Sequence, residues 1–159
     1  MENKTFYEMV EDAITDWNND QNLENYVRVL RTLEVYVAVH EDFYAPVFKI
    51  SPEESIANNY ITLDNERYYA SAGIKYKNGW KAFYVFTSLE KASLPELPEM
   101  KFRYSAKNAL LDYLDSDCDT LFVNWGNDRF EVSKDAAKMI LERAEELRKE
   151  FIDCTTGDE

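Results

Sequence analysis

Apolar residues recur at helical spacing over the first thirty positions of the chain. The apolar face of the first segment consists of Phe6, Met9, Val10, Ala13 and Trp17. Thr5 and Glu8 have the spacing of a capping box, in which a hydroxyl and a carboxylate satisfy free backbone N–H groups at a helix start. The polar run 18–21 ends this helix, and Asn22 is placed to cap a second one. The apolar stripe of that second helix consists of Leu23, Tyr26, Val27 and Leu30. The pattern therefore predicts an N-terminal helical hairpin.

A different pattern, rich in β-branched and aromatic residues, begins at Glu34. Residues 34–39 read Glu-Val-Tyr-Val-Ala-Val, a composition typical of a strand. Two further short strands are predicted at 46–50 and 60–62, on either side of a Ser-Pro-Glu-Glu loop.

The dipeptide Asn78-Gly79 predicts a β-hairpin, because both central positions of a type I′ turn need a positive φ. The cross-strand pairs that a two-residue turn gives on one face are Lys77 with Trp80, Lys75 with Ala82, and Gly73 with Tyr84. The opposite face is more apolar and is expected to pack on the core. The basic and aromatic side chains of the first face would lie together near the hairpin tip.

The second half of the chain alternates predicted helices and strands. Ser88, Ser105 and Ser133 are each placed to cap a helix, and 94–98 is predicted to be an extended linker. Strands are predicted at 120–124 and 130–132, on either side of a turn. The buried stripe of the last helix is expected to be Ala137, Ile140, Leu141, Ala144, Leu147 and Phe151.

These elements predict an α+β fold in a single domain covering residues 1–152. The domain should combine the N-terminal helical hairpin with a mostly antiparallel or mixed sheet of about five to seven strands. The C-terminal helix should pack on that sheet, and residues 153–159 should form a frayed acidic tail. With 159 residues, of which 45% are apolar, the chain is large enough to close a hydrophobic core.

The sequence also indicates in which cellular compartment the protein is found. No apolar run approaches 18 residues, and the N-terminus lacks the basic-then-apolar layout of a signal peptide, so we expect a cytoplasmic protein without a membrane span. Cys118 and Cys154 are too few and too far apart for a disulfide framework or a zinc knuckle.

The chain is strongly acidic, with a net charge of −13. Such a field repels nucleic acid and anionic membranes and favours basic partners. Residues 67–107 depart from this pattern, because they carry eight bases and three acids. Lysines that solubilise strands and protect sheet edges explain this segment best, and a local cationic site is the alternative.

Residues with catalytic or metal-binding potential are few. The single histidine, His40, would need a nucleophile beside it, and Cys118 lies among aspartates that raise the pKa of a thiol. The run Asp115-Ser116-Asp117-Cys118-Asp119 resembles the opening of a calcium loop but lacks the required glycine and glutamate. No glycine-rich phosphate loop is present. We therefore predict no catalytic residue, no metal and no cofactor.

Aromatic residues at two turns are the best candidates for contacts with a partner. Tryptophan is favoured at binding hot spots, although core packing is the simpler expectation for Trp125 in the 124–127 turn. Basic and aromatic side chains could also stack single-stranded bases, but the acidic remainder of the chain opposes this. The predicted partner-binding residues are Lys75, Lys77, Trp80, Tyr84, Asn124 and Trp125.

Several strings, in this order and spacing, resemble the N-terminal domain of the SseB family. The matching strings are Leu30 to Val39, Tyr84 to Glu90, Ala109-Leu110-Leu111, Leu121 to Asn124, and Phe130 to Ser133. The resemblance covers roughly residues 22 to 141. Trp125 departs from it, since proline is expected after the family's asparagine, and the chain has no room for the further C-terminal domain of fuller members. The resemblance implies a small bacterial α+β module, and it implies no catalytic residue or cofactor.

These observations favour a non-catalytic SseB-like domain that binds a protein partner, possessing an acidic surface that steers a basic partner toward aromatic anchors. An immunity or antitoxin-like inhibitor of a basic toxin is the alternative binding function. An amino-acid sensor, suggested by the family name, and a hydrolase using Cys118 or clustered acids are weaker alternatives.

Overall fold

The computed structural model describes residues 4–46, 48–49, 61–63, 66–69, 73–75, 81–95, 97, 99, 101–126 and 128–156. The helices are α1 (Phe6–Asn19), α2 (Leu23–Ala38), α3 (Leu89–Ala92), α4 (Ala106–Asp115) and α5 (Lys134–Thr156). The strands are β1 (Asp42–Pro46), β2 (Phe48–Lys49), β3 (Ile61–Leu63), β4 (Glu66–Tyr69), β5 (Gly73–Lys75), β6 (Lys81–Val85), β7 (Lys101–Ser105), β8 (Thr120–Val123) and β9 (Phe130–Val132). This arrangement confirms the predicted α+β fold.

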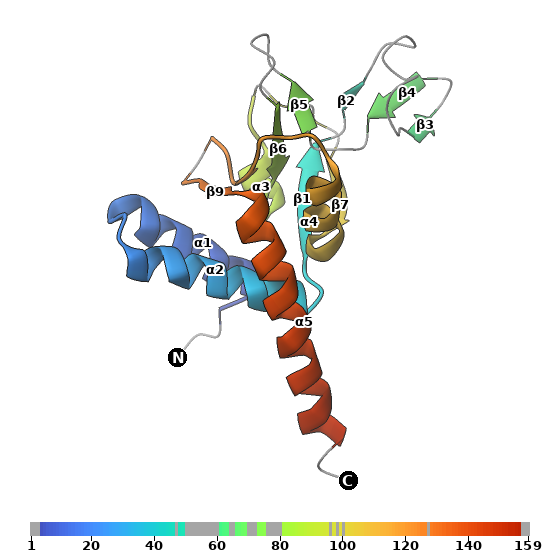
Figure 1. Cartoon of the computed structure of the whole chain (residues 1–159). Helices are drawn as coiled ribbons and strands as arrows, with labels where there is room; N and C mark the ends of the chain where they lie inside the picture. Colours follow the sequence, from blue (N-terminus) through green and yellow to red (C-terminus); the bar gives the residue numbers. More distant parts are fainter. Residues whose placement is uncertain are drawn as a thin grey trace.

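Helices α1 and α2 form the predicted antiparallel hairpin (Figure 1). The capping box of Thr5 and Glu8 is present, and the Asn22 side chain accepts a hydrogen bond from the Asn25 backbone N–H at 2.8 Å. The strand predicted at 34–39 is wrong, because α2 continues to Ala38. Its buried residues Val29, Leu30, Leu33, Tyr36 and Val37 form a helical stripe in the main core. That burial outweighs the strand preference of the β-branched residues, which amounts to less than about 1 kcal/mol per residue.

The end of α2 has the hydrogen bonds of a Schellman motif. The His40 N–H donates to the Val37 carbonyl and the Glu41 N–H donates to the Tyr36 carbonyl, both at 3.1 Å. His40 takes the left-handed conformation, with φ at 61°. A β-carbon makes this conformation costly, and glycine is the usual residue at this position.

His40→Gly should therefore raise the free energy of unfolding by about 0.5–1 kcal/mol. His40→Ala is the matched control, and it should give no gain because it retains the β-carbon. Urea denaturation of the three proteins measures the difference. A glycine variant no more stable than the alanine variant would contradict the assigned backbone conformation.

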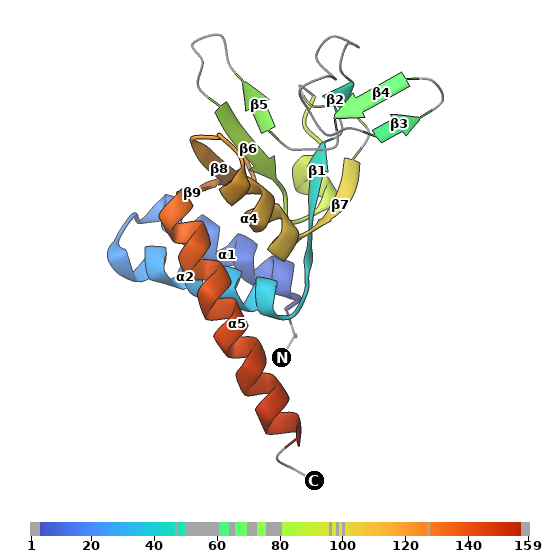
Figure 2. The same cartoon turned by 45° about the vertical axis from the view of Figure 1, so that its right-hand side comes forward.

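The largest sheet among the described residues has four strands in the order β5-β6-β8-β9, with β6 and β8 parallel and the other pairs antiparallel. This is fewer than the predicted five to seven. Strand β1 pairs with β7, and two backbone hydrogen bonds between Tyr44 and Phe86 join this pair to the end of β6. The sheet β2-β4-β3 lies away from the helices (Figure 2).

Two hydrophobic clusters pack on opposite faces of β6 and β8. The larger one includes Phe83 and Leu121 and extends to α1, α2, α4 and α5. The smaller one includes Tyr84 and Phe122 and is completed by Leu94, Leu97 and Trp125. Both faces of the central strands are thus buried, as is common for strands that pair in parallel.

The hairpin register differs by one residue from the prediction. Gly73 lies opposite Phe83 and Lys75 lies opposite Lys81, rather than opposite Tyr84 and Ala82. A one-residue shift exchanges the two faces of a strand. Because both faces of β6 are buried, its side-chain pattern does not specify which register is correct. The predicted turn at 78–79 lies outside the described residues.

Other predicted elements are confirmed or corrected. The caps at Ser88, Ser105 and Ser133 are all present. Strand β7 lies between the predicted linker at 94–98 and the helix that Ser105 caps, where no element was predicted, and β1 begins four residues before the strand predicted at 46–50. Helix α5 packs on α2 and α4 and runs beyond them toward the C-terminus (Figures 1 and 2). It ends at Thr156, so the predicted frayed tail starts too early.

Candidate functional site

Of the predicted partner-binding residues whose side chains the structure describes, two are buried and one is half-buried. Tyr84 is 2% exposed and Asn124 is 1% exposed, so the prediction that these two side chains contact a partner is wrong. Trp125 is half-buried, and its ring lies 5.5 Å from that of Tyr84. Lys75 belongs to β5, while Lys77 and Trp80 lie outside the described residues. Tyr84 is buried because its side chain lies on the face of the sheet that the smaller cluster covers.

Asn124 connects the carboxyl ends of the parallel strands β6 and β8. It directly follows β8 and has φ at 61°, a left-handed conformation that asparagine tolerates better than most residues. Its Oδ1 accepts a hydrogen bond from the Thr87 backbone N–H at 3.0 Å, and its Nδ2 donates to the Thr87 Oγ1 at 3.0 Å. The amide therefore fixes the chain just beyond β6.

Thr87 extends this hydrogen-bonded chain to α1. Its hydroxyl donates to Glu11 Oε1 at 2.7 Å, and the neighbouring Ser88 hydroxyl lies 3.4 Å from the same oxygen. A carboxylate is thus held over the ends of two parallel strands. In open α/β sheets this end of the strands is where ligands commonly bind.

A hollow of about 220 Å³ opens beside Thr87 and Ser88. Three tyrosines from three elements line it, namely Tyr7 of α1, Tyr36 of α2 and Tyr44 of β1. Because phenol rings carry negative charge on their faces, such walls attract cations as well as apolar groups.

Charged residues add to this preference. Glu41, Asp42 and Arg103 also line the hollow, and Arg103 Nη2 lies 2.8 Å from Asp42 Oδ2. The Tyr36 hydroxyl donates to the Asp42 carbonyl oxygen. Burial raises the pKa of Tyr36 far above its usual range, and the charges of Glu41 and Asp42 raise this pKa further. Tyr36 therefore stays neutral, and the charged residues that line the hollow are two acids, Glu41 and Asp42, and one base, Arg103.

The candidate catalytic residues lie elsewhere. Burial is the main cause of a raised pKa at the Cys118 thiol, and Asp117 contributes to the shift, which lowers the reactivity of the thiol. His40 is exposed at the end of α2 and lines a different small hollow, beside Lys107 and Glu145. Cys118 does not line the hollow that contains His40.

The aspartate run that resembles a calcium loop has a structural role. Asp119 accepts a hydrogen bond from the Lys81 backbone N–H at 2.9 Å, and Asp117 forms an ion pair with the Lys81 ammonium group. These contacts hold the start of β6. Among the described residues, no group of three or more His, Cys, Asp or Glu side chains is arranged to hold a metal ion.

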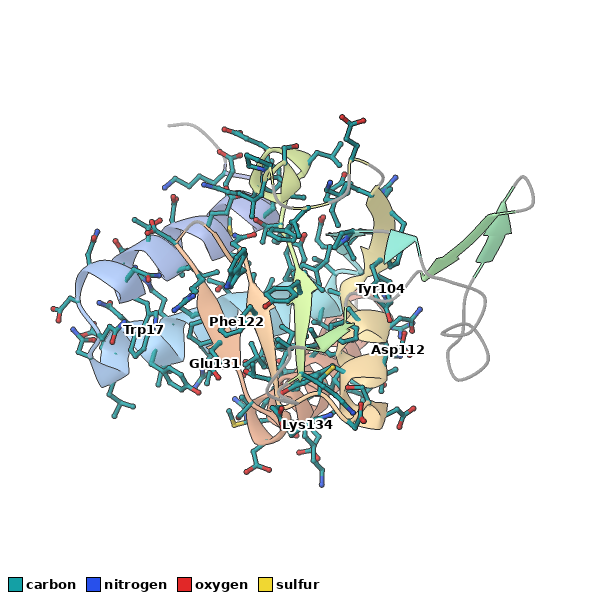
Figure 3. The ribbon with its side chains drawn as sticks, turned by 90° about the horizontal axis from the view of Figure 1, so that it is seen from above. Trp17, Tyr104, Asp112, Phe122, Glu131 and Lys134 are labelled. Carbon is teal, nitrogen blue, oxygen red and sulfur yellow. The ribbon has the colours of Figure 1, made fainter. Side chains whose placement is uncertain are left out.

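A second hollow, of about 480 Å³, lies where the helical hairpin meets β9, the edge strand of the four-stranded sheet. Its rings include Trp17 and Phe130, whose centroids are 6.2 Å apart, and Arg129 lies 5.4 Å from the centre of the Phe122 ring. Figure 3 shows Trp17 on the hairpin beside Phe122 and Glu131. Cationic and anionic groups both border this hollow, so its charge selects no class of ligand.

The sequence did not identify the residues of the tyrosine-lined hollow. Tyr36 was assigned to a strand, and Arg103 was considered only as one of the bases of residues 67–107. The adjacent pair Glu41-Asp42 was the only local signal, and a pair of acids is too common in this chain to be informative. The side chains converge because β1 pairs with β7 and the Tyr44–Phe86 bridge brings β1 to the end of β6.

A scan against protein-family models matches no family, and searches of curated proteins and of solved structures also find no match. Among the helices described, none combines the length and apolar character that a membrane span requires.

Proposed function

We propose that this chain is a non-catalytic protein-binding domain that takes a basic side chain of its partner into the tyrosine-lined hollow. The observation that carries this proposal is the convergence of three tyrosines with the carboxylates of Glu41 and Asp42 around one opening. An arginine or lysine side chain can be bound there by cation–π contacts and by charge at the same time.

The surroundings of the hollow support a protein partner. Helix α1 carries Glu8, Glu11, Asp12 and Asp16 and contains no lysine or arginine. Together with a net charge of −13, this favours rapid encounter with a basic surface. Leu89 is 52% exposed at the rim and offers an apolar contact beside the charged centre.

The remaining sequence-based assignments are parts of the same proposal. We place the protein in the cytoplasm, and we propose membership of the SseB family on the order of the strings that resemble it. Lys75, Lys77, Trp80 and Trp125 are proposed as additional partner contacts. Trp125→Ala should weaken capture of a partner without unfolding the domain if Trp125 contacts that partner.

The proposal is tested with the capped peptide acetyl-Gly-Arg-Gly-Arg-Gly-amide in an NMR titration at low salt. Binding should shift the amide resonances of Glu41, Tyr44 and Thr87. Glu41→Gln should weaken affinity about two- to fivefold, the range expected for the loss of one partly exposed ion pair. About 0.5 M salt should remove most of the binding, since screening then acts over a few ångströms.

Glu131→Gln is the matched control, because it removes the same charge from an exposed position on β9. It should change affinity less than Glu41→Gln does. A peptide with glutamine in place of arginine should not bind. Equal effects of the two substitutions, or shifts spread evenly over the acidic surface, would refute a specific site in the hollow.

A further inference from the structure

Arg103 already places a guanidinium group at the hollow. It lies on β7 directly opposite Tyr44 of β1. Its side chain reaches diagonally across to Asp42, which is also on β1. The distance of 2.8 Å between Arg103 Nη2 and Asp42 Oδ2 is that of a charge-assisted hydrogen bond. The guanidinium of Arg103 is therefore the same chemical group that a partner's arginine would bring into the hollow.

The contact is one that a competitor can displace. The Arg103 side chain is 73% exposed and that of Asp42 is 29% exposed. Exposed ion pairs contribute little to stability, because water and salt screen them and the long side chain loses entropy when it is held. Displacing the guanidinium should therefore cost little.

The backbone beneath the pair does not depend on this contact. Five consecutive residues of β1 pair with β7, and the Tyr36 hydroxyl holds the Asp42 carbonyl oxygen from the other side. The Arg103 side chain can therefore leave Asp42 while the strand and its carboxylate stay in place. The site would remain formed when its internal occupant is exchanged for an external one.

We propose that Arg103 is an internal competitor that occupies the place of the partner's arginine and thereby sets the affinity of the hollow. This inference rests on the proposed function and specifies its ligand as a guanidinium-bearing segment. A partner must displace Arg103 to reach Asp42, so binding exchanges one arginine for another. Partner segments that offer only one basic side chain should therefore bind more weakly than segments that also contact the rim of the hollow.

The test uses the full chain and the same capped arginine peptide. Arg103→Gln should bind the peptide about two- to fivefold more tightly than the unchanged protein, which corresponds to the range of an exposed ion pair. Arg103→Lys retains the charge and should stay close to the original affinity. Urea denaturation of each variant establishes that the fold is retained.

Removing a positive charge also makes the whole protein more acidic, which needs its own control. Arg28→Gln removes the same charge from an exposed ion pair with Asp16, on the helical hairpin. It should change the peptide affinity less than Arg103→Gln. A second control places Arg103→Gln in the Asp42→Asn background, where the gain should disappear because the contested carboxylate is absent.

The outcomes separate the two proposals. If the peptide binds the unchanged protein in the hollow but Arg103→Gln does not bind it more tightly, the competitor role is refuted and the proposed function stands. The competitor role is also refuted if Arg28→Gln gives the same gain, or if the gain persists without Asp42. If neither the unchanged protein nor Arg103→Gln binds the peptide at millimolar concentration, both proposals fail.

Discussion

Asn124→Ala should lower the free energy of unfolding by about 2–4 kcal/mol. Alanine in the left-handed conformation costs about 1 kcal/mol or more, and Asn124 has φ at 61°. The substitution also removes the acceptor of the buried Thr87 N–H, and a buried donor without a partner costs about 1–3 kcal/mol. Urea denaturation followed by circular dichroism measures the loss.

Asn124→Gly separates the two causes. Glycine adopts the left-handed conformation freely but lacks the side-chain amide, so it should be less destabilising than alanine. The difference between the two variants measures the conformational cost, and the remaining loss measures the hydrogen bonds to Thr87. An alanine variant within about 0.5 kcal/mol of the unchanged protein, the usual range for surface substitutions, would show that Asn124 does not hold the strand ends together.

Phe83→Ala should be at least as destabilising, with a loss of about 3–5 kcal/mol. Phe83 is fully buried in the central strand β6, and its ring lies 6.0 Å from that of Tyr113 and 6.3 Å from that of Tyr104. Truncation removes these ring contacts and leaves a cavity between the sheet and α4. A loss of this size is a large part of the total stability of about 5–15 kcal/mol expected for a domain, so a fraction of the variant should be unfolded at 37 °C.

Phe83→Leu is the control for cavity size, because leucine fills most of the space and should cost about 1.5 kcal/mol or less. Thermal and urea unfolding of both variants give the comparison. Equal, small losses in the two variants would show that the Phe83 ring does not fill the core as described.

The hydrogen bonds that join Asn124, Thr87 and Glu11 are related to the tyrosine-lined hollow. Asn124 fixes Thr87, and Thr87 fixes the Glu11 carboxylate, so the interior positions a negative charge close to the hollow. Asn124 was expected to contact a partner directly from a surface turn. Because Asn124 is buried, we infer that it positions Thr87. The contact with a partner is proposed for Glu41 and Asp42.

The features that could be predicted from the sequence are those that depend on contacts between neighbouring residues. Thr5 with Glu8, Asn22 and the three serine caps were found because each hydrogen bond joins residues three positions apart, so the signal lies within one short string. Strands β8 and β9 were found for a similar reason, since a short turn joins them. The composition and the net charge also follow from the sequence without any structure.

Tertiary packing decided the features that depend on distant residues. The helical state of residues 34–38 depends on burial in the core shared with α1 and α5. The register of β5 could not be inferred from the side-chain pattern, because both faces of its partner β6 are buried. The hollow needs the pairing of β1 with β7, which joins segments almost sixty residues apart. Such contacts leave no local signal, because the free energy that selects them comes from apolar surface buried between segments rather than from the order of neighbouring residues.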